Sequence, residues 1–303
     1  MSYRPTGDGA TPLGSEASKI TGPLGIIAGR GVLSCVLADA AAARGLPLHI
    51  VAIRGEAPDE IERFPHTWIR WGEVGKLFAA LDDNGCNDLV IIGGVNRPDF
   101  ANISFDLAAL KALPFILSLG KGGDDSVLSR IVRYFEDKGY RVHGVGDVAP
   151  DLLVGAGRLG NKTPSADDRA DIDVGFKVVS ALGRLDIGQA AVVVKGHVLA
   201  VEAAEGTDAM LIRCAKLRQS GRTGRHTHAG VIVKAPKPGQ EERVDLPTIG
   251  PDTVRNAAAA GLAGIAVAAG RVLMADRAAT IKAADQLGLF LVGETLPTAS
   301  DNS

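Results

Sequence analysis

The alternation of short apolar segments with helix-patterned segments, joined by glycine turns, constrains the fold of the first half most. Leu24–Ala28 is apolar, Gly29-Arg30-Gly31 turns the chain, and Val32–Arg44 carries apolar residues at positions i, i+3, i+4 and i+7. That spacing places them on one helical face. The predicted strands are Leu24–Ala28, Leu48–Ile53, Asp88–Ile92 and Tyr140–Val145, and the predicted helices are Val32–Arg44, Val74–Leu81, Phe105–Leu119 and Ser126–Lys138. This order predicts a Rossmann-like parallel sheet.

The second half predicts a second α/β domain, joined to the first by a linker. Between about Gly155 and Asp171 the composition shifts to Gly, Asn, Pro, Ser and Asp. The predicted strands beyond it are Ala190–Val194, Val198–Val201, Ala229–Lys234, Ile265–Ala268, Val272–Leu273 and Leu289–Val292, and the predicted helices are Asp171–Leu182, Asp208–Leu217, Pro251–Ala260 and Asp276–Leu287. We expect residues 1–21 to be a disordered leader or a remnant of expression, and residues 22–158 and 168–296 to be the two domains.

Composition excludes several classes of protein. A hydrophobic content of 46% with 22% charged residues fits a globular chain. With 33 Lys and Arg against 35 Asp and Glu, and only 4% aromatic residues, the chain lacks the basic excess and the stacking platforms of a nucleic-acid-binding protein. Cys35, Cys86 and Cys214 form no CxxC pair, so they support neither a disulfide framework nor a cysteine-rich zinc site. A reducing cytoplasm is the simplest compartment for them.

Two glycine turns of the first half are candidates for binding an anion. Gly29-Arg30-Gly31 precedes a helix, whose free N–H groups favour a phosphate. A tight structural turn explains the same residues equally well. Ser34 stands where a dinucleotide fingerprint has its third glycine, so an NAD(P)-dependent oxidoreductase rests on Gly29 and Gly31 alone. Gly93-Gly94 ends another strand, which we expect at the same rim of the sheet.

A third glycine pair lies within the segment Lys121-Gly122-Gly123-Asp124-Asp125, which opens a predicted helix. Aspartate is favoured at the cap and in the first turn of a helix, which explains this segment without any ligand. The adjacent lysine and paired carboxylates also suit the ribose, base or phosphate of a nucleotide.

Carboxylates gather before the helix that starts near Asp208 in the second half. Glu202, Glu205 and Asp208 flank Thr207, which is a good N-cap residue. Helix capping therefore explains part of the pattern. Three carboxylates within seven residues are also oxygen donors of the kind that Mg²⁺ prefers.

The segment Arg213–Arg243 holds eight Lys and Arg residues, which form either a solvated basic face or an anion-binding wall. Lys234 ends a predicted strand, and Lys237 lies between two prolines. His226 and His228 fit exposed loop histidines better than metal ligands. Asp245 opens the segment DLPTIGP, whose prolines hold the chain ahead of a helix. It is positioned either for catalysis or for a loop ion pair with Arg243.

Four segments together resemble the LpxI type of UDP-2,3-diacylglucosamine pyrophosphatase. They are Leu24–Gly31 (LGIIAGRG), Glu205–Asp208 (EGTD), Lys234–Gln240 (KAPKPGQ) and Arg243–Pro251 (RVDLPTIGP), and the similarity spans about Leu24 to Glu294. Glu241 departs from the aspartate that often follows the glutamine in that pattern. The chain has no Walker loop, Nudix run or GNH[ED] element, so the other pyrophosphatase classes are not favoured.

The resemblance implies hydrolysis of UDP-2,3-diacylglucosamine to UMP and 2,3-diacylglucosamine 1-phosphate (lipid X) in lipid A synthesis. It also implies a divalent cation such as Mg²⁺, a cytoplasmic enzyme that is peripheral on the inner membrane, and a homodimer. The family's catalytic aspartate matches Asp245. A carrier of a nucleotide sugar or lipid that does not hydrolyse it is the rival class.

We therefore expect the first domain to hold the nucleotide-sugar head and the second to carry the chemistry. The expected catalytic residues are Asp245, Lys234 and Lys237, and the expected metal ligands are Asp245, Glu202 and Glu205. The expected substrate-binding residues are Gly29, Arg30, Gly31, Gly93, Gly94, Lys121, Gly122, Gly123, Asp124, Asp125, Thr207, Asp208 and Thr248. No nucleic acid is expected as a partner.

Overall fold

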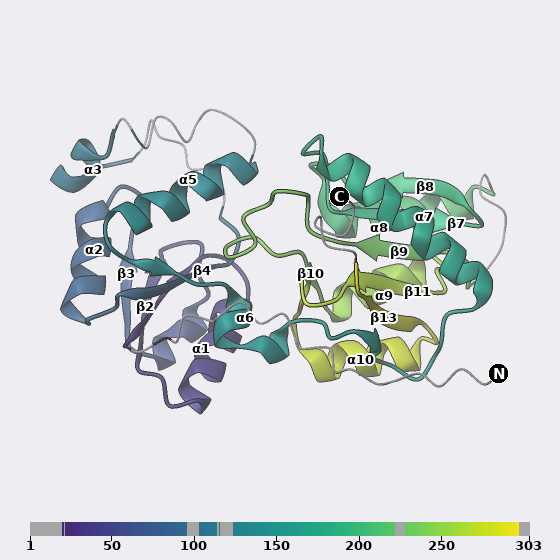
Figure 1. Cartoon of the computed structure of the whole chain (residues 1–303), viewed down its shortest axis with the longest axis horizontal. Coiled ribbons are helices and arrows are strands. Elements are labelled where there is room, and N and C mark those ends of the chain that lie inside the picture. Colours follow the sequence, from purple (N-terminus) through teal and green to yellow (C-terminus); the bar gives the residue numbers. More distant parts are fainter. Residues whose placement is uncertain are drawn as a thin grey trace, which may run out of the picture.

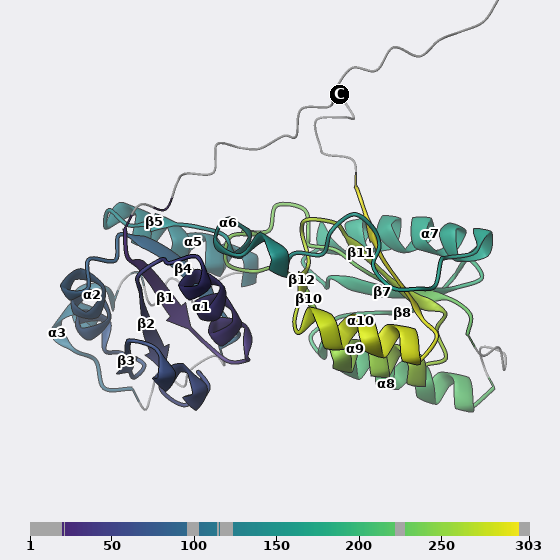
Figure 2. The ribbon, with the colours of Figure 1, turned by 90° about the horizontal axis from the view of Figure 1, so that it is seen from below.

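The computed structural model describes residues 20, 22–95, 103–113, 115, 124–221 and 228–296, with residues 124–126 described by their backbone alone. In these residues the chain forms two α/β domains that lie side by side (Figure 1). α6 and the segment after it connect the two domains, as the view from below shows (Figure 2). The predicted fold class, a Rossmann-like domain followed by a second α/β domain, is confirmed.

The sheet of the first domain is parallel throughout, because every pairing in it is parallel. Its strands are β1 (Leu24–Ala28), β2 (Leu48–Ile53), β3 (His66–Ile69), β4 (Asp88–Ile92) and β5 (Arg141–Val142). They lie in the order β3-β2-β1-β4-β5, which is the strand order of Rossmann folds. In such sheets ligands bind outside the carboxyl ends of the strands where the order reverses, here next to β1 and β4.

Helices cover both faces of this sheet, which explains why its central strands are nearly continuous apolar runs. The helices are α1 (Leu33–Ala43), α2 (Val74–Asp83), α3 (Leu107–Lys111), α5 (Asp124–Asp137) and α6 (Val145–Val148), with 3₁₀ helices at Asp59–Arg63 and Pro150–Leu152. One core lies between the sheet and α1 with α6. The other lies between the sheet and α2 with α5.

The second domain is a mixed sheet with helices on both faces. Its strands are β6 (Gly157–Arg158), β7 (Ala190–Val194), β8 (His197–Val201), β9 (Val231–Lys234), β11 (Gly264–Ala268) and β13 (Phe290–Glu294), in the order β6-β13-β11-β9-β7-β8. Its helices are α7 (Ala166–Gly183), α8 (Gly206–Gln219), α9 (Pro251–Ala259) and α10 (Arg277–Gln286). α7 covers one face, and α8, α9 and α10 cover the other (Figure 2).

The pairing of strands places the ends of β8 and β9 at one edge of the second sheet. β7 is antiparallel to both, so β8 and β9 run in the same direction. A separate pair of short strands, β10 (Thr248–Ile249) and β12 (Leu273–Met274), lies between the domains (Figure 2). β10 falls inside the DLPTIGP segment, where no strand was predicted.

Several predicted elements differ from the structure. The predicted strand Tyr140–Val145 is wrong at its end, because β5 stops at Val142 and Val145 begins α6. The backbone N–H of Gly144 donates to the Asp147 carboxylate at 2.9 Å, which closes the start of α6. β3 and α6 were not predicted, since four residues each give little periodicity. In the predicted helix Phe105–Leu119, the structure has α3 beginning at Leu107, with Asp106 as its cap, and residues 114 and 116–123 lie outside the description.

The segment predicted as a linker contributes partly to the second domain. β6 pairs antiparallel with β13. α7 begins before the predicted Asp171, because Ser165 caps it: its hydroxyl oxygen accepts from the Asp168 N–H at 3.2 Å, and Asp168 accepts from the Ser165 N–H at 2.9 Å. This reciprocal capping satisfies two N–H groups that the first turn leaves without partners. The domain limits 22–158 and 168–296 stay a prediction.

A buried acidic group stabilises the first sheet where β4 and β5 begin. Asp88 is fully buried, accepts from Arg141 Nε and Nη2 at 2.8 Å each, and lies 2.7 Å from His143 Nε2. Burial raises the pKa of this carboxyl, but the hydrogen bonds from Arg141 and His143 outweigh it and hold the pKa below its usual value.

Candidate active site

Lys234 is a buried cation at the carboxyl end of β9. Only 7% of the residue is exposed. Its Nζ donates to the Thr207 hydroxyl oxygen at 2.8 Å and to the Thr248 carbonyl oxygen at 3.0 Å. Lys234 therefore joins three elements at one point: the end of β9, the first turn of α8 and β10.

Thr207 does not cap α8 as the pattern suggested, because the cap position is Glu205 and Thr207 lies in the first turn. Its hydroxyl donates to Glu202 Oε1 at 2.6 Å. Glu202 follows β8, is buried, and also accepts from the Gln189 N–H at 3.1 Å. The predicted residues Lys234, Thr207, Thr248 and Glu202 thus form one connected network.

The charge balance around Lys234 is acidic. Burial lowers the pKa of the ammonium, and the carboxylates of Glu202, Asp208 and Asp245 oppose this by attracting its charge, with burial the larger effect. Asp208 is held by an Asn256 side-chain amide that donates to it at 3.0 Å. The structure therefore brings Asp208 and Asp245 into the electrostatic environment of Lys234.

Asp245 lies in the loop between β9 and β10, and Gln240 orients its carboxylate. The Gln240 amide nitrogen donates to Asp245 Oδ2, while its amide oxygen accepts from the Lys237 N–H at 2.8 Å. Gln240 is buried. Sequence reasoning missed this role, although Gln240 ends the KAPKPGQ motif and the motif was a usable signal.

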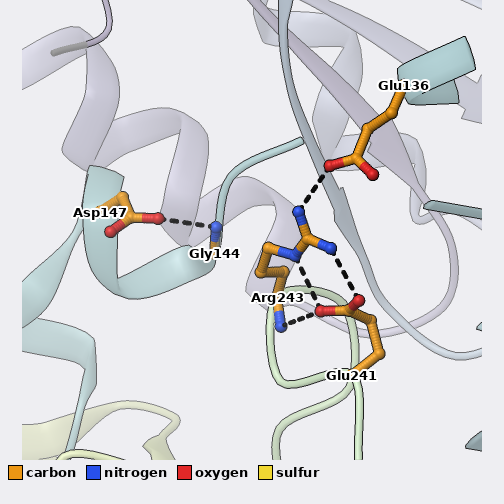
Figure 3. Close-up of polar contacts among 5 residues, drawn as sticks. All are labelled: Glu136, Gly144, Asp147, Glu241 and Arg243. Atoms are coloured by element: carbon orange, nitrogen blue, oxygen red, sulfur yellow. Dashed lines mark hydrogen bonds and ion pairs between the residues drawn. The ribbon is translucent and has the colours of Figure 1, made fainter. Parts of the chain in front are cut away.

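The same loop is tied to the first domain by Arg243 (Figure 3). The Arg243 guanidinium donates to Glu136 of α5 at 2.7 Å and to Glu241 of its own loop at 2.8 Å. These hydrogen bonds, the one to Glu241 first, raise the pKa of Arg243 despite its partial burial. The alternative to a catalytic role for Asp245 was an ion pair with Arg243. Among the described residues, the carboxylate partners of Arg243 are instead Glu136 and Glu241.

Apolar side chains of the second domain also pack into the first. Leu246 and Leu273 contact the core between α1 and α6, and Val244 contacts the core between α2 and α5. The loop that carries Asp245 is therefore positioned by both domains. The candidate base Asp245 therefore lies where the two domains meet.

Two predicted site residues have other partners. Lys237 is buried and its ammonium pairs with Asp186. Glu205 pairs with Arg213 at 2.7 Å. Neither contact joins the network of Lys234, Thr207 and Glu202.

The glycine turns of the first domain do meet, as predicted for neighbouring strands. The Arg30 N–H donates to the Gly94 carbonyl at 2.6 Å, and the Gly94 N–H donates to Arg30 at 3.2 Å. A Cβ atom added to Gly29 would lie 2.5 Å from the Gly94 carbonyl oxygen, so only glycine permits this approach. This close packing of the two turns explains why glycine occupies positions 29 and 93. The Arg30 side chain pairs with Glu56 at 3.2 Å.

The third glycine segment is only partly described. Asp124 and Asp125 begin α5, and nothing beyond their backbone is described. Lys121, Gly122 and Gly123 lie outside the described residues, as does His226, so the predictions on them stay predictions.

The expected metal ligands do not converge. Across the described ranges, no group of three or more His, Cys, Asp and Glu side chains could hold a metal ion. Glu202 is occupied by Thr207 and Gln189, and Glu205 by Arg213. Mg²⁺ often uses one or two carboxylates together with substrate phosphates instead of a full protein cage, and Asp245 fits that mode. In the part of the chain that is described, no helix is both long and apolar enough to span a membrane.

Comparison with known proteins agrees with the arrangement of the chain in two domains. The LpxI N-terminal domain family matches residues 23–152, and the LpxI C-terminal domain family matches residues 155–292. The chain is also similar to the UDP-2,3-diacylglucosamine pyrophosphatase LpxI of Caulobacter vibrioides. The two are 46% identical over 270 residues, which cover 89% of this chain and 96% of that protein.

Proposed function

The chain belongs to the LpxI family, and on that premise we propose that it hydrolyses the pyrophosphate of UDP-2,3-diacylglucosamine to UMP and 2,3-diacylglucosamine 1-phosphate. The observation that carries the proposal is a match over both domains to a relative with that activity in its name. The network around Lys234 and Asp245 supports it, because it offers a cation for phosphoryl oxygens and a carboxylate for water.

The reaction forms one bond and breaks one bond at phosphorus. The oxygen of a water molecule attacks one of the two phosphorus atoms, and the bond from that phosphorus to the bridging oxygen breaks. Asp245 accepts the proton of the attacking water as the general base. The hydrogen bond from Gln240 orients its carboxylate for this role. Lys234 stabilises the negative charge that develops on the phosphoryl oxygens.

We assign the binding of the nucleotide-sugar head to the first domain. The turns at Gly29–Gly31 and Gly93–Gly94 meet at the carboxyl ends of β1 and β4, where Rossmann-like sheets bind their ligands. Arg30 lies in the first of these turns and can contact a phosphate if it exchanges Glu56 for it.

The decisive experiment is turnover of UDP-2,3-diacylglucosamine by the purified protein, followed as release of UMP. A protein that binds this substrate without releasing UMP would be a carrier, and the proposal would be wrong. Hydrolysis in H₂¹⁸O then tells which phosphorus is attacked, because the label enters the product that contains that phosphorus.

We also propose that Mg²⁺ takes part, with Asp245 supplying a carboxylate and the pyrophosphate supplying further oxygens. The cation would neutralise charge on the pyrophosphate when bound. Dialysis against EDTA should abolish turnover, and added Mg²⁺ should restore it; an unchanged rate would refute this role.

Peripheral membrane association and a homodimer are further proposals that rest on family membership alone. Flotation with vesicles that contain the substrate tests the first, since a protein that stays with the soluble fraction would contradict it. Light scattering of the purified protein tests the second, and a monomer mass would contradict it.

A further inference from the structure

Glu202 has a structural arrangement that the proposed chemistry does not yet use. It is buried at the carboxyl end of β8. Both of its carboxylate oxygens have partners: Oε1 accepts from the Thr207 hydroxyl at 2.6 Å, and Oε2 accepts from the Gln189 N–H at 3.1 Å. These two hydrogen bonds, one on each oxygen, fix the orientation of the buried carboxylate.

The Thr207 hydroxyl links the Glu202 carboxylate to the Lys234 ammonium by one hydrogen bond to each. A hydroxyl has one proton and two lone pairs, whereas a lysine ammonium has only donors. Because Thr207 gives its proton to Glu202, it presents a lone pair to the Lys234 ammonium 2.8 Å away. Without an acceptor at Glu202, that hydroxyl could rotate and turn its proton toward Lys234.

The second contact of Lys234 joins it to the segment that carries Asp245. Its Nζ also donates to the carbonyl of Thr248, three positions after Asp245 in the DLPTIGP segment. Two directed contacts on one buried ammonium limit where it can lie. A buried cation that is held in advance stabilises charge at phosphorus without a cost of reorganisation.

We propose that Glu202 is a positioning residue of the active site, which acts through the Thr207 hydroxyl to hold the Lys234 ammonium against the DLPTIGP segment that carries Asp245. This inference rests on the proposed function. It gives Glu202 a task other than the metal binding expected from its sequence position, and it gives Thr207 a task other than direct contact with substrate.

The test compares Glu202→Gln, Thr207→Val and Thr207→Ser, with Asp252→Asn as a matched control. Asp252 is an exposed carboxylate that pairs with Arg255 on α9. Glutamine has a single acceptor oxygen, which the fixed Gln189 N–H takes, so its amide N–H₂ faces Thr207 and no acceptor holds the Thr207 proton. We therefore expect Glu202→Gln and Thr207→Val to lower kcat roughly 10- to 100-fold, in keeping with a small misplacement of a catalytic group. KM should stay within about threefold, because the interaction acts mainly in the transition state. Thr207→Ser should recover most of the rate, since it keeps the hydroxyl.

The double variant of Glu202 and Thr207 supplies a readout that a merely structural role would not give. Both changes remove the same hydrogen-bonded chain, so the double variant should lose about as much as one single variant. Independent losses that multiply would overturn the proposal. So would a Glu202→Gln rate that equals the wild-type rate, equal losses in Thr207→Ser and Thr207→Val, or a loss that excess Mg²⁺ restores.

The outcomes separate this inference from the function on which it rests. A wild-type protein that releases no UMP overturns both. An active wild type with active Glu202 and Thr207 variants overturns the inference alone. Melting temperatures are recorded for every variant, and Thr207→Val, which nearly preserves side-chain shape, decides the matter if Glu202→Gln does not fold.

Discussion

Replacing Asp245 by asparagine separates its chemical role from its structural one. The side chain is half-buried, and Gln240 donates to its carboxylate. Asparagine keeps an oxygen that can accept the same hydrogen bond, so the free energy of unfolding should change by about 1 kcal/mol or less. The loop itself is held by Arg243 and Leu246, which the change leaves in place.

The catalytic loss should be far larger than this. A positioned general base contributes roughly 10²- to 10⁴-fold to a rate. At about 1.36 kcal/mol per tenfold, that is about 3–5 kcal/mol of the activation barrier. An amide cannot accept the proton of water at neutral pH, so Asp245→Asn should lose at least about 100-fold in kcat. Substrate affinity measured without Mg²⁺ should stay within a few-fold, because the base acts in the transition state.

The assay measures UMP release at saturating substrate, substrate affinity by calorimetry and the melting temperature, with Asp252→Asn as the control. A variant within a few-fold of the wild-type rate would refute the assignment of Asp245 as the base. A variant that melts many degrees earlier would refute the argument that the side chain contributes little to the fold.

Three further outcomes follow from the packing and ion pairs of the structure. The pKa of Asp88 is depressed in the fold, so the stability that its carboxylate contributes is present above about pH 4 and is lost as the pH falls further. In urea unfolding at pH 7 and pH 3, the free energy of unfolding should therefore fall less with pH in Asp88→Asn than in the wild type. Gly29→Ala should lower the melting temperature by several degrees, because its Cβ would lie 2.5 Å from the Gly94 carbonyl oxygen. In the Gly94→Ala control the added Cβ has no neighbour closer than 3.8 Å, and equal melting temperatures of the two variants would contradict the argument. Glu136→Ala removes the partner that ties Arg243 to α5 and should cost at most about 1 kcal/mol in urea unfolding. It should still lower kcat several-fold by releasing the Asp245 loop, and an unchanged kcat would show that the contact with α5 does not position this loop.

Much of the fold is readable from local sequence. The limits predicted for β1, β2, β4 and β7 are those of the structure, because each is a mostly apolar run bounded by proline, glycine or polar residues. α10 has its cap at Asp276, the predicted first residue. Where periodicity is short, as at β3, prediction failed.

The candidate site was readable in its residue types but not in its partners. Lys234, Thr207 and Asp245 were singled out because each lies at the end of a strand or next to the start of a helix. The contact of Lys234 with Thr207 joins residues 27 positions apart, and the tie between Arg243 and Glu136 joins residues 107 apart. No local pattern encodes such a pairing.

The sequence by itself determined the two α/β domains, their central strands and the acidic and basic residues available for chemistry. These follow from hydrophobic periodicity, glycine turns and helix caps, which act over a few residues. Only the tertiary structure decided which polar groups meet, such as Lys234 with Thr207 and Lys237 with Asp186. The reason is that strand order and register set these distances, and burial then makes each buried polar group take whichever partner the fold brings within reach.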